Sequence, residues 1–324
     1  AIAGEGHSGA INVTSGGLID FSAAGSTAAF TQIGHGGFRS FGDHSGNIAV
    51  EAVDGVNFTA AAGNQAFAMI GNGGYDSDFQ TDRVTLAEGG GATTGTNFHV
   101  NIPSADAVGT SGNISVLATG ATASINLLSG NGTDAFSQIG NGGSSTSGDH
   151  SGNVKLLAGE NIAATANNAA RSYTLVGNGG YDADGNHSGL LSARAGTGGT
   201  TGAITFTAGN GASTFAQFGN GGTRSSRDHS GRLEMLAIND IQFLGGGGID
   251  AYAQFGNGGY LSWFGGPSTV GAIGDLSMGS TGGRIVFAGG TANDTYAQLG
   301  NGGRNNKGAH AGNIVARSAS DFLV

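Results

Sequence analysis

Short stretches in which apolar and polar residues alternate recur along the whole chain. In segment 48–52, Ile48 and Val50 alternate with Ala49 and Glu51, and the same register returns near residues 154, 233 and 314. A period of two residues is typical of β-strands with one buried face. The 3.6-residue spacing of amphipathic helices is absent, so the pattern predicts an all-β protein.

The alternation also predicts which side chains form the core. Charged residues fall only on the parity opposite to the large apolar ones. Because neighbouring strand residues point to opposite faces, the apolar parity should be buried. We expect burial of Ile33, Ile48, Val50, Phe58, Ile139, Val154, Leu156, Ile204, Phe206, Phe218, Ile241, Phe243, Phe255, Ile285, Phe287, Leu299 and Ile314, and exposure of Glu51, Lys155, Arg194, Glu234 and Arg317.

A glycine-rich motif divides the chain into repeats. Ile-Gly-Asn-Gly-Gly or a close variant occurs seven times, with its first glycine at positions 34, 71, 140, 177, 219, 256 and 300. The period is about 40 residues, apart from one interval of 69. A His-Ser-Gly motif or a variant of it follows most copies. Self-similarity at this period is typical of solenoids and propellers.

Each repeat contains three short strands joined by Gly, Asn, Asp and Ser corners. This arrangement predicts a parallel β-helix, or β-solenoid, of about 16 coils, with roughly two coils per repeat and a length of about 80 Å. A β-propeller is the alternative, but its blades need longer antiparallel strands and a Trp-Asp signature, and this chain has one Trp.

We expect residues 1–324 to form one continuous solenoid. Both ends fall inside the repeat pattern, so we expect a fragment of a longer repeat protein with further coils, or other copies, stacked on it. The pattern is broken at two places. Residues 84–112 should form a lengthened or extra coil, and residues 260–270 a lengthened corner.

The amino-acid composition and the net charge exclude several classes of protein. Gly accounts for 67 of 324 residues, with 2 Pro, no Cys and a net charge of −10. Collagen would need a three-residue Gly period, and a disordered chain would lack the regular β-branched and aromatic residues. The negative charge argues against nucleic acid as a partner. No run approaches 18 apolar residues, so the sequence predicts no membrane-spanning helix.

Two recurring polar residues are interpreted as corner ladders. Gly tolerates positive φ and Asn tolerates it better than most residues, so Gly-Asn-Gly-Gly predicts a corner whose asparagines stack as an amide ladder. The asparagines are Asn72, Asn141, Asn178, Asn220, Asn257 and Asn301. The histidines His44, His150, His187, His229 and His310 should bond to neighbouring backbone, with metal binding, pH sensing and ligand contact as the alternatives.

For the histidines, two coils per repeat would put equivalent rings about 10 Å apart, too far for a shared zinc ion. We therefore expect no transition metal. Calcium is the one cofactor considered, at the paired aspartates Asp76 with Asp78 and Asp182 with Asp184, with solvated turns as the alternative.

An aromatic residue precedes every glycine motif by four positions. Alternation places it on the face opposite Ile33, beside Gln32, where it could form an exposed stripe that binds sugars or a second rod. The alternative is that these rings belong to the core. The residues are Phe30, Phe67, Phe136, Tyr173, Phe215, Tyr252 and Tyr296.

The combination Ala-Gln-Ile-Gly-Asn/His-Gly-Gly followed by Asp-His-Ser-Gly-Asn-Ile resembles the repeat region of filamentous-haemagglutinin-like exoproteins, large bacterial adhesins exported by two-partner secretion. The resemblance spans nearly the whole chain. It implies a right-handed β-helix at the cell surface or outside the cell, working in attachment, cell-cell contact or biofilm, with no catalytic residues. Surface polysaccharide is an expected partner. The alternatives are a β-helical polysaccharide-degrading enzyme and a calcium-stabilised spacer.

Overall fold

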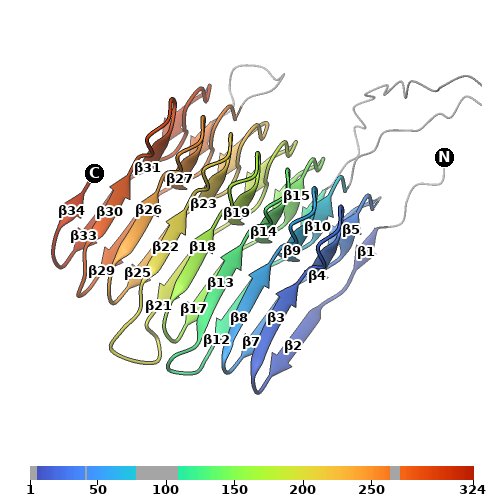
Figure 1. Cartoon of the computed structure of the whole chain (residues 1–324), viewed down its shortest axis with the longest axis horizontal. Helices are drawn as coiled ribbons and strands as arrows, with labels where there is room; N and C mark the ends of the chain where they lie inside the picture. Colours follow the sequence, from blue (N-terminus) through green and yellow to red (C-terminus); the bar gives the residue numbers. More distant parts are fainter. Residues whose placement is uncertain (1–5, 41, 78–108, 263–270) are drawn as a thin grey trace, which may run out of the picture.

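The computed structural model describes residues 6–40, 42–77, 109–262 and 271–324. In these residues the protein is all-β, without a helix, and forms a parallel β-solenoid (Figure 1). The strands stack in chain order along the rod, from blue to red in Figure 1, so successive coils are neighbours in space. The predicted fold class is confirmed.

Each repeat makes one coil, and equivalent strands of successive coils pair in register. The His-Ser motifs form the corner sheet, which contains β1 (His7–Ser8), β6 (His44–Ser45), β11 (Thr110–Ser111), β16 (His150–Ser151), β20 (His187–Ser188), β24 (His229–Ser230), β28 (Ala272–Ile273) and β32 (His310–Ala311). The first wall contains β2 (Ile11–Ser15), β7 (Ile48–Ala52), β12 (Ile114–Ala118), β17 (Val154–Ala158), β21 (Leu191–Ala195), β25 (Leu233–Ala237), β29 (Leu276–Ser280) and β33 (Ile314–Ser318).

The remaining strands complete the cross-section of the coil. The second wall contains β3 (Leu18–Ser22), β8 (Gly55–Thr59), β13 (Ser124–Leu128), β18 (Ile162–Thr165), β22 (Ile204–Thr207), β26 (Ile241–Leu244), β30 (Ile285–Ala288) and β34 (Phe322–Leu323). The middle sheet contains β4 (Phe30–Ile33), β9 (Phe67–Ile70), β14 (Phe136–Ile139), β19 (Tyr173–Val176), β23 (Phe215–Phe218), β27 (Tyr252–Phe255) and β31 (Tyr296–Leu299). A short sheet contains β5 (Gly36–Phe38), β10 (Gly73–Tyr75) and β15 (Gly142–Ser144).

The predicted number of coils is wrong. His7 pairs directly with His44 and His150 with His187, so one repeat makes one coil and the described residues form about seven turns instead of 16 coils. At about 4.8 Å between neighbouring strands, eight stacked strands span roughly 35 Å, not 80 Å.

The coil is twice as long as expected because it encloses two cores. The first core lies between the two walls and one face of the middle sheet, which contributes residues such as Ile70 and Ile139. The second core lies on the other face of that sheet, around Phe67, Phe136 and Tyr173. The middle sheet is therefore buried on both faces. One coil of the chain surrounds both cores, where we had expected one coil for each core.

The predicted parity of the strands is confirmed for most of the core. Fourteen of the seventeen predicted residues are buried. Ile33 and Leu299 are half-buried and Ile314 is 49% exposed, because their coils have a neighbouring coil on one side only among the described residues. Glu51, Lys155, Arg194 and Arg317 are exposed and Glu234 is half-exposed, as expected.

The two interruptions of the repeat leave the stacking in register. On either side of the first, Ile48 pairs with Ile114 and His44 with Thr110, so Gly109–Gly112 occupy the ordinary corner position. The rest of the predicted 84–112 segment lies outside the described residues. Of the predicted corner 260–270, residues 263–270 also lie outside them.

Candidate functional site

The predicted asparagine ladder exists and its members are bound on every side. The backbone N–H of Asn141 donates to Oδ1 of Asn178 (3.0 Å), and the backbone N–H of Asn178 donates to Oδ1 of Asn220 (3.1 Å). Nδ2 of Asn178 donates to the carbonyls of Gly152 and Ser188, both at 2.8 Å. Each central asparagine thus ties its own corner to the next coil and to the His-Ser corner.

The same bonding pattern runs through the other asparagines of the ladder. The residues involved are Asn72, Asn141, Asn220, Asn257 and Asn301. All of them except the half-buried Asn301 are fully buried. Their donors and acceptors are occupied by the backbone, so the ladder serves the stacking of the coils.

The glycines beside the ladder are needed for close stacking as well as for positive φ. Gly73 has φ of 118°, and a Cβ there would lie 2.0 Å from the carbonyl oxygen of Gly142 in the next coil. The sequence pattern predicted the positive φ. It gave no sign that a neighbouring coil packs directly on these backbone atoms.

The corner histidines stack face to face inside the solenoid. The ring centroids of His150 and His187 are 5.1 Å apart, and those of His187 and His229 are 5.0 Å apart, with nearly parallel planes. His44, His150, His187 and His229 are buried, whereas His310 is exposed on the last coil. The spacing of about 10 Å that we expected is wrong, because the histidines lie on successive coils.

Side-chain hydroxyls, not backbone groups, hold most of these rings. Nε2 of His44, His150 and His229 lies 3.0, 2.9 and 3.3 Å from the hydroxyl oxygens of Ser40, Thr146 and Ser225. Each hydroxyl precedes its histidine by four residues, a spacing that is visible in the sequence but that was not among the predicted contacts. In the coil of His187 the residue at this position is Ala183. A backbone interaction with Ala183 partly opposes the lowering of the His187 pKa, but neither ring nitrogen of His187 has a well-aligned hydrogen bond.

Burial keeps the stacked imidazoles neutral. Desolvation lowers the pKa of His187 from 6.5 to about 4, and it lowers those of His150 and His229 well below 6.5, with repulsion from His187 as a second cause for both. Nitrogen lone pairs lie in the ring plane, so parallel stacked rings do not direct them at one shared ion. Among the described residues, no three His, Asp or Glu side chains form a group able to hold a metal ion.

The recurring aromatic residues belong to the second core, so the core alternative is confirmed and the exposed stripe is wrong. Phe67, Phe136, Tyr173, Phe215 and Tyr252 are fully buried, and Tyr296 is half-buried. Their rings stack on successive coils, with centroids 4.5–5.2 Å apart between Phe67 and Tyr252. Phe30, in the first middle-sheet strand, is 45% exposed. The parity was right, but this face is shielded by a covering segment, which consists of the glycine motif and the residues after it, such as Tyr75 and Tyr260.

The glutamines beside the rings bind that covering segment. Nε2 of Gln217 donates to the carbonyls of Gly256 (3.1 Å) and Gly258 (2.8 Å) in the next coil. Oε1 of the same residue accepts a bond from the hydroxyl of Tyr252 (3.1 Å). Gln138 repeats the donor pattern toward Gly177 and Gly179. The amides therefore satisfy glycine carbonyls inside the rod and are closed to a ligand.

The described carboxylates of the calcium hypothesis pair with arginines. Asp76 lies 3.2 Å from Arg39, Asp182 lies 3.4 Å from Arg224, and Asp184 lies 3.7 Å from Arg227 and accepts a hydrogen bond from Ser226. These arginines come from neighbouring coils and supply positive charge where a calcium ion would supply it. Asp78 lies outside the described residues, and calcium binding stays a prediction.

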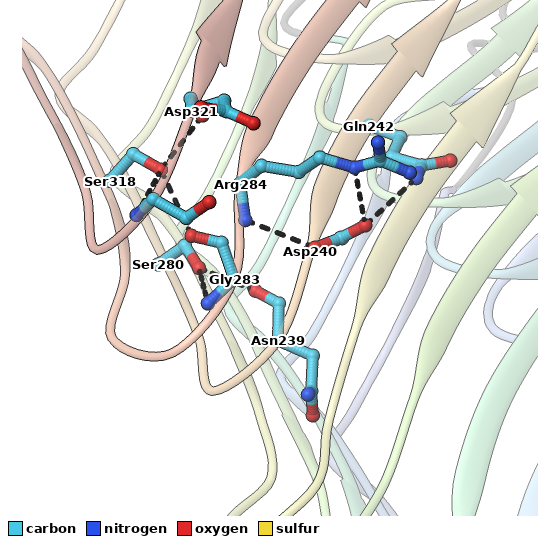
Figure 2. Close-up of polar contacts among 9 residues, drawn as sticks. Asn239, Asp240, Gln242, Ser280, Gly283, Arg284, Ser318 and Asp321 are labelled. Atoms are coloured by element: carbon cyan, nitrogen blue, oxygen red, sulfur yellow. Dashed lines mark hydrogen bonds and ion pairs between the residues drawn. The ribbon is translucent and has the colours of Figure 1, made fainter.

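A further polar network lies at the corner between the two walls (Figure 2). There Asp240 accepts bonds from the backbone N–H and Nε of Arg284, both at 3.0 Å, and from Nε2 of Gln242 at 3.3 Å. The bond from the Arg284 backbone is the main reason why the pKa of Asp240 is lowered. Beside it, the Ser280 hydroxyl donates to the carbonyl of Asn239 (2.6 Å) and the Ser318 hydroxyl to that of Gly283 (2.9 Å). These bonds again join successive coils.

The conspicuous residues of the repeat are thus bound to one another. Among the described residues we find no helix that is long and apolar enough to cross a membrane. Comparison of the chain with protein-family models, curated proteins and solved structures found no match.

Proposed function

We propose that this chain is part of a structural and adhesive rod, secreted by a bacterium or held at its surface. The observation that supports this proposal best is that the recurring Asn and Gln side chains bond between coils and the recurring His rings stack between coils. Such a stack of nearly identical coils makes a stiff spacer whose outer faces are free to carry contacts.

The resemblance of the repeat motifs to filamentous-haemagglutinin-like exoproteins supports an extracellular or cell-surface location and export by two-partner secretion. Attachment, cell-cell contact or a place in the biofilm matrix are roles that a rod of this kind would serve. We propose no catalytic activity, since the stacked imidazoles of His150, His187 and His229 are buried. The carboxylates of the same motif, such as Asp149 and Asp228, are held by backbone N–H groups of the next coil.

Stacking of further coils or copies is part of the proposal. Phe30 in the first middle-sheet strand is 45% exposed and Ile314 in the last first-wall strand is 49% exposed. Strand edges that carry exposed core side chains favour the addition of another strand. Further coils of the same polypeptide, or a second rod placed end to end, fit these two faces; lateral packing of rods is the other arrangement proposed.

Antibodies against the chain test the location on intact cells of the source organism. The proposal expects labelling without permeabilisation, and weaker attachment of cells to a surface when the gene is deleted. Labelling that needs permeabilisation would contradict it. In a separate assay, new reducing ends released from polysaccharides by the purified chain would support the enzyme alternative instead.

A further inference from the structure

In the described part of the chain, three cationic side chains lack the carboxylate partner that seven arginines have. Ion pairs are formed by Arg39, Arg171, Arg224, Arg227, Arg232, Arg284 and Arg304. Within the described part of the chain, Lys155, Arg194 and Arg317 form none. In a chain with a net charge of −10, cations without an anion are unexpected.

These three side chains lie on one surface. Lys155 is in β17, Arg194 in β21 and Arg317 in β33, all strands of the first wall, and all three are exposed at outward-facing positions. Glu234, the carboxylate on the strand between Arg194 and Gly279, is bound to Arg232 at 2.5 Å. The outer face of the wall from β17 to β33 therefore carries excess positive charge.

A depression of about 500 Å³ lies between the two arginines. Its lining includes Arg194, Leu236, Gly279 and Arg317, the hydroxyl residues Ser192 and Ser277, and Glu234, whose carboxylate is neutralised by Arg232. Gly279 follows Leu236 and precedes Arg317 in the register of the sheet, so a missing side chain opens the surface there. A Cβ at Gly279 would lie 3.3 Å from Cδ1 of Leu236, the flexible end of a side chain.

The cations run along the axis of the rod. Arg194 and Arg317 occupy the same register position, three strands and about 14 Å apart at the strand spacing of a sheet. Lys155 lies on the strand before Arg194, two residues nearer the start of the strand. A linear polymer with a negative charge on successive units would meet them in turn. The serine hydroxyls and the Leu236 side chain would face its polar groups and its apolar ring faces.

We propose that the outer face of the first wall binds a linear acidic polysaccharide, with carboxylates on Lys155, Arg194 and Arg317 and a sugar unit in the depression at Gly279. This deepens the proposed adhesive function, on which it rests, by naming its ligand class. Nucleic acid and anionic membrane are disfavoured because the rest of the rod is negatively charged and would be repelled by a broad anionic surface.

Binding of the purified full chain to polygalacturonate, measured by calorimetry with a calcium chelator present, tests the proposal. The matched ligand is the same polymer with its carboxylates methyl-esterified. We expect binding of the acid form that weakens with salt, and no binding of the ester. A sulfated polymer of similar length shows whether carboxylate or negative charge alone is recognised, and carboxylate should bind more tightly.

Two double variants with the same change in net charge locate the site. R194Q/R317Q should weaken binding about tenfold, since each exposed contact contributes about 0.7 kcal/mol. R39Q/R227Q removes two exposed arginines from elsewhere on the rod and should change the affinity less than threefold. Gly279→Leu fills the depression and should weaken binding without loss of the β-sheet circular dichroism signal.

Several results would overturn the proposal. They are equal binding of the esterified polymer, equal losses in the two double variants, or binding of phosphatidylserine vesicles that polygalacturonate does not displace. Because the assay uses purified chain in solution, its outcome is independent of the location on cells, which tests the proposed function separately.

Discussion

Replacing Asn178 with alanine should remove a junction between three corners of the solenoid. The side chain is fully buried, its Oδ1 accepts the backbone N–H of Asn141, and its Nδ2 donates to the carbonyls of Gly152 and Ser188. The Ser188 carbonyl keeps a second bond from the Gly152 N–H. The variant therefore leaves two backbone groups without a partner.

The cost follows from where those two groups lie. Asn141 is fully buried, so its N–H should carry the full penalty of a buried unsatisfied donor, about 2 kcal/mol, while the half-buried Gly152 carbonyl should carry about 1 kcal/mol. We expect Asn178→Ala to lower the free energy of unfolding by about 3 kcal/mol. In a stack of coils that contact only their neighbours, the loss should be concentrated around the altered coil.

Asn153→Ala is the matched control. Asn153 is also an asparagine whose Oδ1 accepts a backbone N–H of the next coil, from Leu190 at 2.9 Å, but it is exposed to water. Its loss should cost less than about 1 kcal/mol. Guanidinium titration followed by circular dichroism gives both values, and hydrogen exchange should show faster exchange of the Asn141 amide in Asn178→Ala. Equal stabilities of the two variants would refute the reasoning.

Three further predictions concern side chains buried inside the solenoid. Ala183→Ser restores the hydroxyl found four residues before the other buried histidines, so it should stabilise the chain by about 1 kcal/mol, and an unchanged or lower melting temperature would argue against that. The pKa of His187 is lowered from 6.5 to about 4, so between these pH values the unfolded chain binds a proton that the folded chain does not. The free energy of unfolding should therefore fall as the pH drops from 6.5 toward 4, by about 2 kcal/mol at pH 5 for this ring. A urea midpoint that stays constant from pH 7 to pH 5 would contradict it. Phe136→Ala should lower the free energy of unfolding by about 3–5 kcal/mol. The control Leu128→Ala should lower it far less, because Leu128 is 37% exposed on the second wall. Similar urea midpoints of the two variants would place the Phe136 ring outside a core.

The sequence was sufficient to predict the strands and which residues of each strand share a face. Alternation correctly placed Ile48 and Val50 inside and Glu51 outside, and it correctly placed Phe136 and Gln138 on the face of their strand opposite Ile139. A period of two residues tells which side chains share a face. It does not tell what covers that face, which is why the second core was missed.

The predicted number of coils was wrong for the same reason. Strand pattern and corner residues mark where the chain turns, but the number of strands in one coil depends on whether one core or two fill its cross-section. The histidine spacing and the exposed aromatic stripe were wrong as a consequence. The hydroxyls of Ser40, Thr146 and Ser225, four residues before their histidines, were visible in the sequence and would have indicated buried imidazoles.

One coil per repeat is the central structural claim, and a pair of engineered cysteines tests it most directly. The chain has no cysteine, and Ser115 pairs in register with Lys155 on the outer face of the first wall. Neighbouring strands lie about 4.8 Å apart, within the range of about 4.4–6.8 Å between Cα atoms that a disulfide spans. Ser192, the partner of Lys155 on the next strand, lies about 10 Å from Ser115. We predict that S115C/K155C forms an intramolecular disulfide under mild oxidation and that S115C/S192C does not. Failure of the first pair to close, with the strand structure intact, would mean that another coil lies between the two repeats.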